Sequence, residues 1–224
     1  MTRLSKFVTK IFKITGFLCF SFPVYASNVC DDFYKEPVVK TKVNYGNVTF
    51  KSVPKSEILN YEKLKNPMAT LGFTLANFSI EYDFDLEKYQ VDGGVCLVLS
   101  KLNFVIGYKN IDVLIDDKYK QNSCEYNAVK EHEQGHINIY KNELKYYGKL
   151  ITNELKDIAF YIKPMFFQTS VSGKKMENEI QNAVFENQNI KLLKNKLKQT
   201  LIAENQNYDS SEEYKRVKNL CDGW

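Results

Sequence analysis

The spacing of apolar residues changes once along this chain of 224 residues, close to Asn122. Before that point apolar and polar side chains alternate, most clearly over residues 78–84, which is typical of a strand with one buried face. After it, apolar side chains recur at the spacing of one face of a helix. Strands followed by helices predict an α+β fold, in which a small antiparallel sheet of three or four strands precedes a helical half.

Turn signals and helix caps set the boundaries of the expected elements. The predicted strands cover 43–50 around an Asn-Tyr-Gly-Asn turn signal, 78–84, 95–108 and 112–115. A short helix is expected over 54–64, and a longer one begins after Ser123, a favourable N-cap residue. Gly148 is expected to bend or end that helix, and two more are predicted over 150–162 and 176–205.

The first 26 residues have the pattern of a secretory signal peptide. Four basic residues and no acidic one precede an apolar run over 14–22, which is too short to span a bilayer. Val24-Tyr25-Ala26 then offers a signal peptidase site. We therefore expect a signal peptide over 1–26, a single mature domain over 27–224, and export to the periplasm or the medium. The alternative is an uncleaved membrane anchor, and no later stretch is apolar enough to span a membrane.

The mature chain is electrically neutral. Arg3, Lys6, Lys10 and Lys13 of the leader account for the whole formal charge of +4. A nucleic-acid-binding protein needs a surplus of cations to neutralise phosphates, so that class of partner is not expected. Aromatic residues make up 14% of the chain, too many for a disordered protein, and the length suits one compact domain.

Four cysteines remain after the leader: Cys30, Cys96, Cys124 and Cys221. An even number of cysteines in an exported protein predicts two disulfides, and the absence of a CxxC pair argues against a cysteine metal site. Three pairings are possible. We expect Cys96 to pair with Cys124 and Cys30 with Cys221, which would tie together the two ends of the mature chain.

Both histidines of the chain belong to one HExxH motif, His132-Glu133-Gln134-Gly135-His136. On a helix, positions i and i+4 project from the same face, so both imidazoles can reach one metal ion. Glu133 is rotated about 100° around the helix axis and can take the proton of a water that attacks a peptide carbonyl. The motif predicts a zinc peptidase site, with His132 and His136 as ligands and Glu133 as general base.

A third ligand does not follow directly from the motif. Catalytic zinc sites keep three protein ligands, whereas structural sites usually have four and are rich in cysteine. Glu143 is about 10 Å further along the helix than His136, too far to share the ion. Glu154 is a candidate if the chain reverses near Gly148, although a solvated helix face explains it equally well.

Taken together, these features resemble a bacterial family of secreted proteins of unknown function that are described as zinc-dependent proteases. The resemblance rests on the exported N-terminus, the strands at 43–50 and 78–82, the Gly94-Val95-Cys96 segment and the helix over 126–136 that carries HExxH. It implies a zincin-like domain.

The family's C-terminal motif, Tyr-Asp-x-x-Thr-x-His-Gly, corresponds to residues 208–215, which are Tyr-Asp-Ser-Ser-Glu-Glu-Tyr-Lys. The family's histidine would be a natural third ligand, and Tyr214 stands in its place. The resemblance therefore implies Tyr214 or Glu213 as a third ligand, because phenolate and carboxylate oxygens can bind zinc. A two-histidine remnant that binds metal weakly is the alternative.

The expected function is that of an exported, zinc-dependent endopeptidase that acts on peptide or protein substrates. Its expected cofactor is Zn²⁺. The alternative is a non-catalytic exported module, a degenerate protease that binds metal or a protein partner. The substrate and the oligomeric state stay open.

Overall fold

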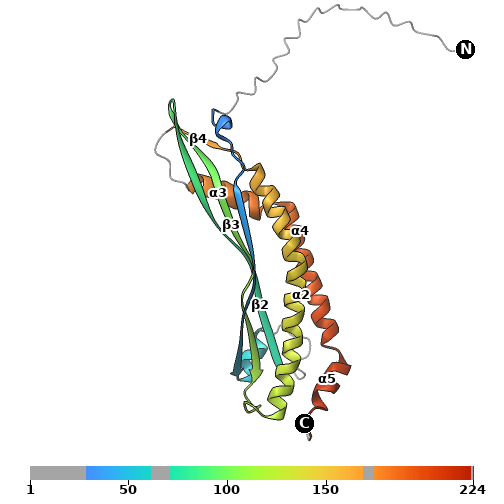
Figure 1. Ribbon diagram of the computed structural model, residues 1–224. Coiled ribbons are helices and arrows are strands. Elements are labelled where there is room, and N and C mark those ends of the chain that lie inside the picture. Colours follow the sequence, from blue (N-terminus) through green and yellow to red (C-terminus); the bar gives the residue numbers. More distant parts are fainter. Residues whose placement is uncertain (1–28, 62–70, 169–173, 223) are drawn as a thin grey trace, which may run out of the picture.

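The computed structural model describes residues 29–61, 71–168, 174–222 and 224 (Figure 1). The expected signal peptide over 1–26 lies outside the described residues. The described chain is an α+β fold, as expected, in which three long strands precede most of the helices. A short 3-10 helix, Asp31–Phe33, comes before the first strand.

Within the described residues the sheet has four strands: β1 (Val38–Val53), β2 (Gly72–Val91), β3 (Gly94–Asp116) and β4 (Met165–Phe167). The long strands are ordered β1-β3-β2, and β4 pairs with the start of β3. β2 and β3 form an antiparallel hairpin, but β1 runs parallel to β3, so the sheet is mixed. The expectation of a purely antiparallel sheet is wrong at β1, because β3 lies between β1 and β2 and alternation within a strand does not identify its neighbours.

β3 is the central strand and the most buried element of the sheet. It passes without interruption through the two segments expected at 95–108 and 112–115. Leu102, Ile106 and Ile111 are fully buried on it. A glycine allows close contact with β1: Gly107 has φ +136°, and a Cβ there would lie 2.1 Å from the carbonyl oxygen of Asn44. The turn signal at 44–47 does not end β1, which continues through Gly46 at φ +77°.

Five helices accompany the sheet in the described ranges: α1 (Lys55–Tyr61), α2 (Cys124–Tyr161), α3 (Lys174–Phe185), α4 (Gln188–Tyr208) and α5 (Ser211–Lys218). α2 begins at the expected N-cap, where Ser123 accepts a hydrogen bond from the backbone N–H of Tyr126. It then runs for 38 residues through Gly148, which is buried against Val43, so the predicted break there is wrong. The single helix expected over 176–205 is two helices, because Asn187 caps a new one at α4.

Helices α2 to α5 form a layer along one face of the long sheet (Figure 1), whereas α1 packs through Ile58 on Leu114 of the other face. α2 runs along the sheet, and α4 and α5 run beside α2 toward the C-terminus. One apolar cluster joins Phe104 and Ile106 to Leu155 of α2 and to α3. A second joins Tyr108, Val113, Val129 and Leu144, nearer the start of α2. The HExxH motif therefore lies in the half of the molecule where the C-terminus comes back to the beginning of α2.

The described residues contain two disulfides, Cys30–Cys96 and Cys124–Cys221, so the four cysteines that follow the expected signal peptide are all bridged, as predicted. The expected pairing is wrong. Cys96 lies near the start of β3 and Cys124 lies beyond its end, and the strand between them spans about 65 Å. Each cysteine instead pairs with the one that the fold brings to the same end of the sheet.

Among the helices of the described ranges, none has the length and apolarity needed to cross a bilayer. Together with two disulfides, this fits an exported protein.

The parallel contact between β1 and β3 predicts a large effect of Gly107→Ala on stability. The new Cβ would meet the Asn44 carbonyl oxygen and impose a backbone conformation that favours glycine. We expect the free energy of unfolding to fall by about 3 kcal/mol or more. Gly93→Ala is the matched control, because Gly93 also has positive φ but no atom within 4 Å of the new Cβ. It should cost only about 1 kcal/mol in urea denaturation, and equal losses in the two variants would contradict the close contact.

Candidate metal site

The three motif side chains converge in the interior beside the first part of α2. His132, Glu133 and His136 are 4%, 2% and 7% exposed, which is unusual for polar residues and requires partners. One ligand atom from each lies within 4.8 Å of the other two. This buried His-Glu-His group could hold a metal ion.

Asp209 completes the group of donor atoms. Its Oδ1 lies 3.1 Å from His132 Nε2 and 3.0 Å from His136 Nε2, so one carboxylate oxygen faces both imidazoles. An ion bound tetrahedrally with bonds of 2.0–2.2 Å keeps neighbouring ligand atoms about 3.3 Å apart. The observed separations are close to that value. Each of the two nitrogen–oxygen pairs could therefore share one ion with little movement.

The other nitrogen of each imidazole is held by a separate partner. Asn205 Nδ2 donates to the carbonyl oxygen of Leu201 at 2.6 Å, which orients its Oδ1 toward His136 Nδ1 at 2.6 Å. Because Oδ1 can only accept, His136 donates from Nδ1. The hydrogen bond from Nε2 to Asp209 then requires the protonated ring, and loss of the Nε2 proton would free its lone pair for a metal. His132 Nδ1 lies 3.4 Å from Glu213 Oε1. Such outer hydrogen bonds orient metal-binding histidines.

The structure assigns different positions to the three expected third ligands. Glu213 faces Nδ1 of His132 rather than Nε2, and both its oxygens accept hydrogen bonds from Arg216. Tyr214 lines the same cavity, with its ring 5.6 Å from that of His132. Glu154 is far along α2, where it accepts a hydrogen bond from Asn189 and lines a different cavity. The closest match to a third ligand is Asp209, which was not among the three expected residues.

Sequence does contain a signal for Asp209. Tyr208 and Asp209 match the Tyr-Asp of the C-terminal motif with which residues 208–215 were compared above, whereas Tyr214 stands at its histidine position. Tyr208 packs directly on the motif: its ring stacks on His132 at 5.0 Å and lies edge-on to His136 at 5.1 Å. A Cβ at Gly135 would lie 2.1 Å from the Tyr208 hydroxyl. Glycine within HExxH thus lets the C-terminal segment approach the helix.

Glu133 is positioned by the neighbouring edge strand. Thr74 of β2 donates a hydrogen bond to Glu133 Oε2 at 2.6 Å, and Gly72 leaves room for the other oxygen, since a Cβ there would lie 2.6 Å from Oε1. Burial raises the pKa of Glu133, although the nearby histidines and the Thr74 hydrogen bond oppose the increase. A carboxylate with a raised pKa is a stronger base, which suits proton transfer from water.

The two carboxylates that face the imidazoles, Asp209 and Glu213, both have lowered pKa values. Burial favours the neutral form of Asp209, but hydrogen bonds from His132 and His136 and their charges outweigh it and hold its pKa at about 2. The hydrogen bonds from Arg216 hold the pKa of Glu213 at about 2 as well. Both carboxylates are therefore ionised near neutral pH, as metal coordination and orientation of an imidazole require.

A cavity of about 150 Å³ opens onto these groups. It is bounded by β2 on one side and by the C-terminal segment on the other, and its wall includes Leu71, Phe73, Thr74, Tyr140, Asn205, Asp209 and Tyr214. The volume exceeds that of several waters, so a small polar group of a ligand can reach Glu133 and the imidazole and carboxylate atoms.

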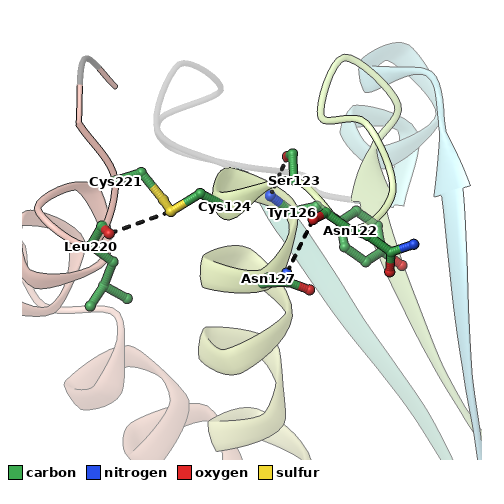
Figure 2. Close-up of a disulfide and its surroundings, with 7 residues drawn as sticks. All are labelled: Asn122, Ser123, Cys124, Tyr126, Asn127, Leu220 and Cys221. Atoms are coloured by element: carbon green, nitrogen blue, oxygen red, sulfur yellow. Dashed lines mark hydrogen bonds between the residues drawn. A yellow bond between two sulfur atoms is a disulfide. The ribbon is translucent and has the colours of Figure 1, made fainter.

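The Cys124–Cys221 disulfide holds the C-terminal segment against α2. Figure 2 shows this bond joining the first residue of the helix to the chain that follows α5, next to the capped turn of Ser123. Cys124 Sγ also lies 3.4 Å from the carbonyl oxygen of Leu220. Arg216 adds a second link between α5 and α2 through Glu131 at 3.1 Å. These two links set the position of the segment that carries Asp209 and Glu213.

Comparison of this chain with protein-family models, with curated proteins and with solved structures finds no match. The functional argument therefore rests on the site itself.

Loss of the Cys124–Cys221 bond is predicted to weaken metal binding. In a Cys124→Ser/Cys221→Ser variant the segment with Asp209 and Glu213 gains freedom, so the affinity for a divalent metal ion should fall about tenfold to hundredfold. The matched control is Cys30→Ser/Cys96→Ser, which removes the disulfide that lies away from the HExxH group. Both variants should lose about 4 kcal/mol of stability. Competition titration at a temperature where both are folded should show the affinity loss only in the first, and equal affinities would contradict the role of this bond.

Proposed function

We propose that this protein is an exported metallopeptidase, in which His132, His136 and Asp209 bind a zinc ion and Glu133 is the general base. The supporting observation is the meeting of both Nε2 atoms with a single carboxylate oxygen beside a buried glutamate. Three ligands from nitrogen and oxygen, with space left open, are typical of catalytic zinc and not of structural zinc.

Zinc at this position would act as a Lewis acid, activating water and polarising a carbonyl group. The residues of the chain perform the remaining tasks. Glu133 accepts the proton of the attacking water and can return it to the leaving amine, with its carboxylate held by Thr74. Tyr140 and Tyr214 line the same cavity, where a phenol can donate a hydrogen bond to the oxygen that gains negative charge.

The substrate is proposed to be a peptide, because the cavity borders an edge strand. Among the described strands, β2 pairs only with β3, so its other edge is open beside the HExxH helix. An extended peptide can add to such an edge through backbone hydrogen bonds. Gly72, Phe73 and Thr74 of this strand line the cavity and would place a peptide bond next to Glu133.

The alternative of a degenerate, non-catalytic module depended on the missing histidine at 214. Asp209 supplies a third donor atom without that histidine, and Glu133 keeps an orienting partner in Thr74. Both observations favour the enzyme over the module.

The ligand set predicts that Asp209→Ala abolishes tight zinc binding. Two imidazoles alone do not hold zinc tightly, so elemental analysis after dialysis should find well under one zinc per chain. Glu154→Ala is the control, because Glu154 lies on the same helix as HExxH but in another cavity, and it should retain zinc as the wild type does. Full zinc occupancy in Asp209→Ala, together with loss of zinc in a Tyr214→Phe variant, would show that Tyr214 and not Asp209 is the third ligand.

The mechanism predicts that Glu133→Gln keeps the metal and loses the activity. The amide has the shape of the carboxylate and can still accept a hydrogen bond from Thr74, but it cannot take a proton from water. We expect kcat on a mixed peptide library to fall by about 10²–10⁴-fold with zinc content unchanged. Chelator should abolish the wild-type activity and added zinc should restore it. Undiminished hydrolysis by Glu133→Gln would show that another group is the base.

A further inference from the structure

A second cavity continues from the candidate metal site along α4. Its volume is about 640 Å³, and it shares four wall residues with the smaller cavity: Phe73, Tyr140, Asn205 and Asp209. We call it the α4 groove. Because of the shared wall, a molecule bound at the metal site would extend directly into it.

The walls of the α4 groove are mostly apolar. Its sheet side is formed by Phe73, Ala76 and Phe78 of β2 with Tyr108 of β3, and its helix side includes Leu197, Leu201 and Ile202 of α4. Ile202 is 42% exposed, so an apolar side chain faces water at the rim. The hydroxyl of Tyr108 is buried without a hydrogen-bond partner among the described residues. An apolar wall with an unpaired polar group is suited to a ligand with both apolar side chains and amide groups.

The far end of the groove is basic. Lys194 and Lys198 lie on its rim, are exposed, and form no ion pair within the described ranges. Asp209, at the metal end, is the one acidic residue among those that line it. The field at the far end therefore attracts a negative group of the ligand.

The length of the α4 groove matches that of a short extended peptide. From Asp209 back to Lys194 the helix covers 15 residues, or about 22 Å along its axis. An extended chain of about six or seven residues has the same length. The aliphatic middle of the groove, at Leu201, lies about 12 Å from Asp209, which corresponds to the third or fourth of those residues.

We propose that the α4 groove is the specificity-determining part of the substrate site, which takes an extended peptide with a large apolar residue three or four positions from the cleaved bond and acidic residues beyond it. The proposal rests on the proposed peptidase function and adds the substrate class. Ile202, Lys194 and Lys198 are the residues that select it.

Binding is measured separately from catalysis, with the zinc-loaded Glu133→Gln protein and isothermal titration calorimetry. The probes are blocked eight-residue peptides with central leucine and phenylalanine and two glutamates at either the N-terminal or the C-terminal end, which covers both chain directions. Matched peptides replace the apolar residues with serine or the glutamates with lysine. We expect at least one glutamate peptide to bind, and its serine version to bind about tenfold more weakly or worse.

Two pairs of variants test the walls. Ile202→Glu should weaken binding of the glutamate peptide about tenfold, whereas Leu192→Glu, which places the same charge at another exposed position of α4, should change it less than about twofold. Lys198→Glu should weaken the glutamate peptide and strengthen the lysine peptide, and Lys196→Glu, outside the groove, should do neither. The effect of Lys198→Glu should decrease at high salt.

The possible failures can be told apart. The proposed role of the α4 groove would be contradicted if the Ile202→Glu and Leu192→Glu variants bound the glutamate peptide equally well. It would also be contradicted if the wild-type groove bound the serine peptide as tightly as the glutamate peptide, even if the wild type cleaves peptides. Binding with the expected variant pattern, in a wild type that cleaves nothing, would support the groove and count against the peptidase. Binding of fatty acid but of no peptide would overturn the proposed occupant.

Discussion

The hydrogen bonds from His132 and His136 to one oxygen of Asp209 are the interaction on which the site depends. They join the beginning of α2 to the end of α4, residues separated by more than 70 positions in the chain. Buried imidazoles need partners, and a carboxylate shared by two of them is stable because the negative charge is offset on both sides. The same arrangement leaves three donor atoms around one point, which a divalent cation can occupy.

This interaction in turn requires that the C-terminal segment be held in place. α4 lies along α2, Ser210 caps the short helix α5 by accepting from the backbone N–H of Glu213, and the Cys124–Cys221 bond closes the loop. Glycine at position 135 allows Tyr208 to pack on the helix backbone between the two histidines. Each of these groups helps to fix the position of Asp209, although none of them would touch the ion.

The long sheet explains why the site and the α4 groove are continuous. β2 and β3 are 20 and 23 residues long, and a helix of 38 residues spans them. Because α4 follows α2 and not the sheet, the space between α4 and β2 stays open along several turns of the helix, with the metal site at one end. An elongated groove beside an open strand edge suits an extended chain better than it suits a compact small molecule.

Sequence alone was sufficient for features with local causes. The alternation at 78–84 placed β2, Ser123 placed the start of α2, and the i, i+4 spacing placed His132 and His136 on one face, because each depends only on neighbours along the chain. Tertiary structure decided what depends on distant contacts. These features are the parallel pairing of β1 with β3, the disulfide partners at each end of the sheet, and the choice of Asp209 rather than Glu154 beside the histidines. Glu154 and Asp209 are both acidic residues downstream of the motif, but α2 continues straight past Glu154, whereas the chain returns to the histidines with Asp209. No local sequence pattern predicts that the chain comes back to the start of α2, because this reversal results from the packing of α4 on α2.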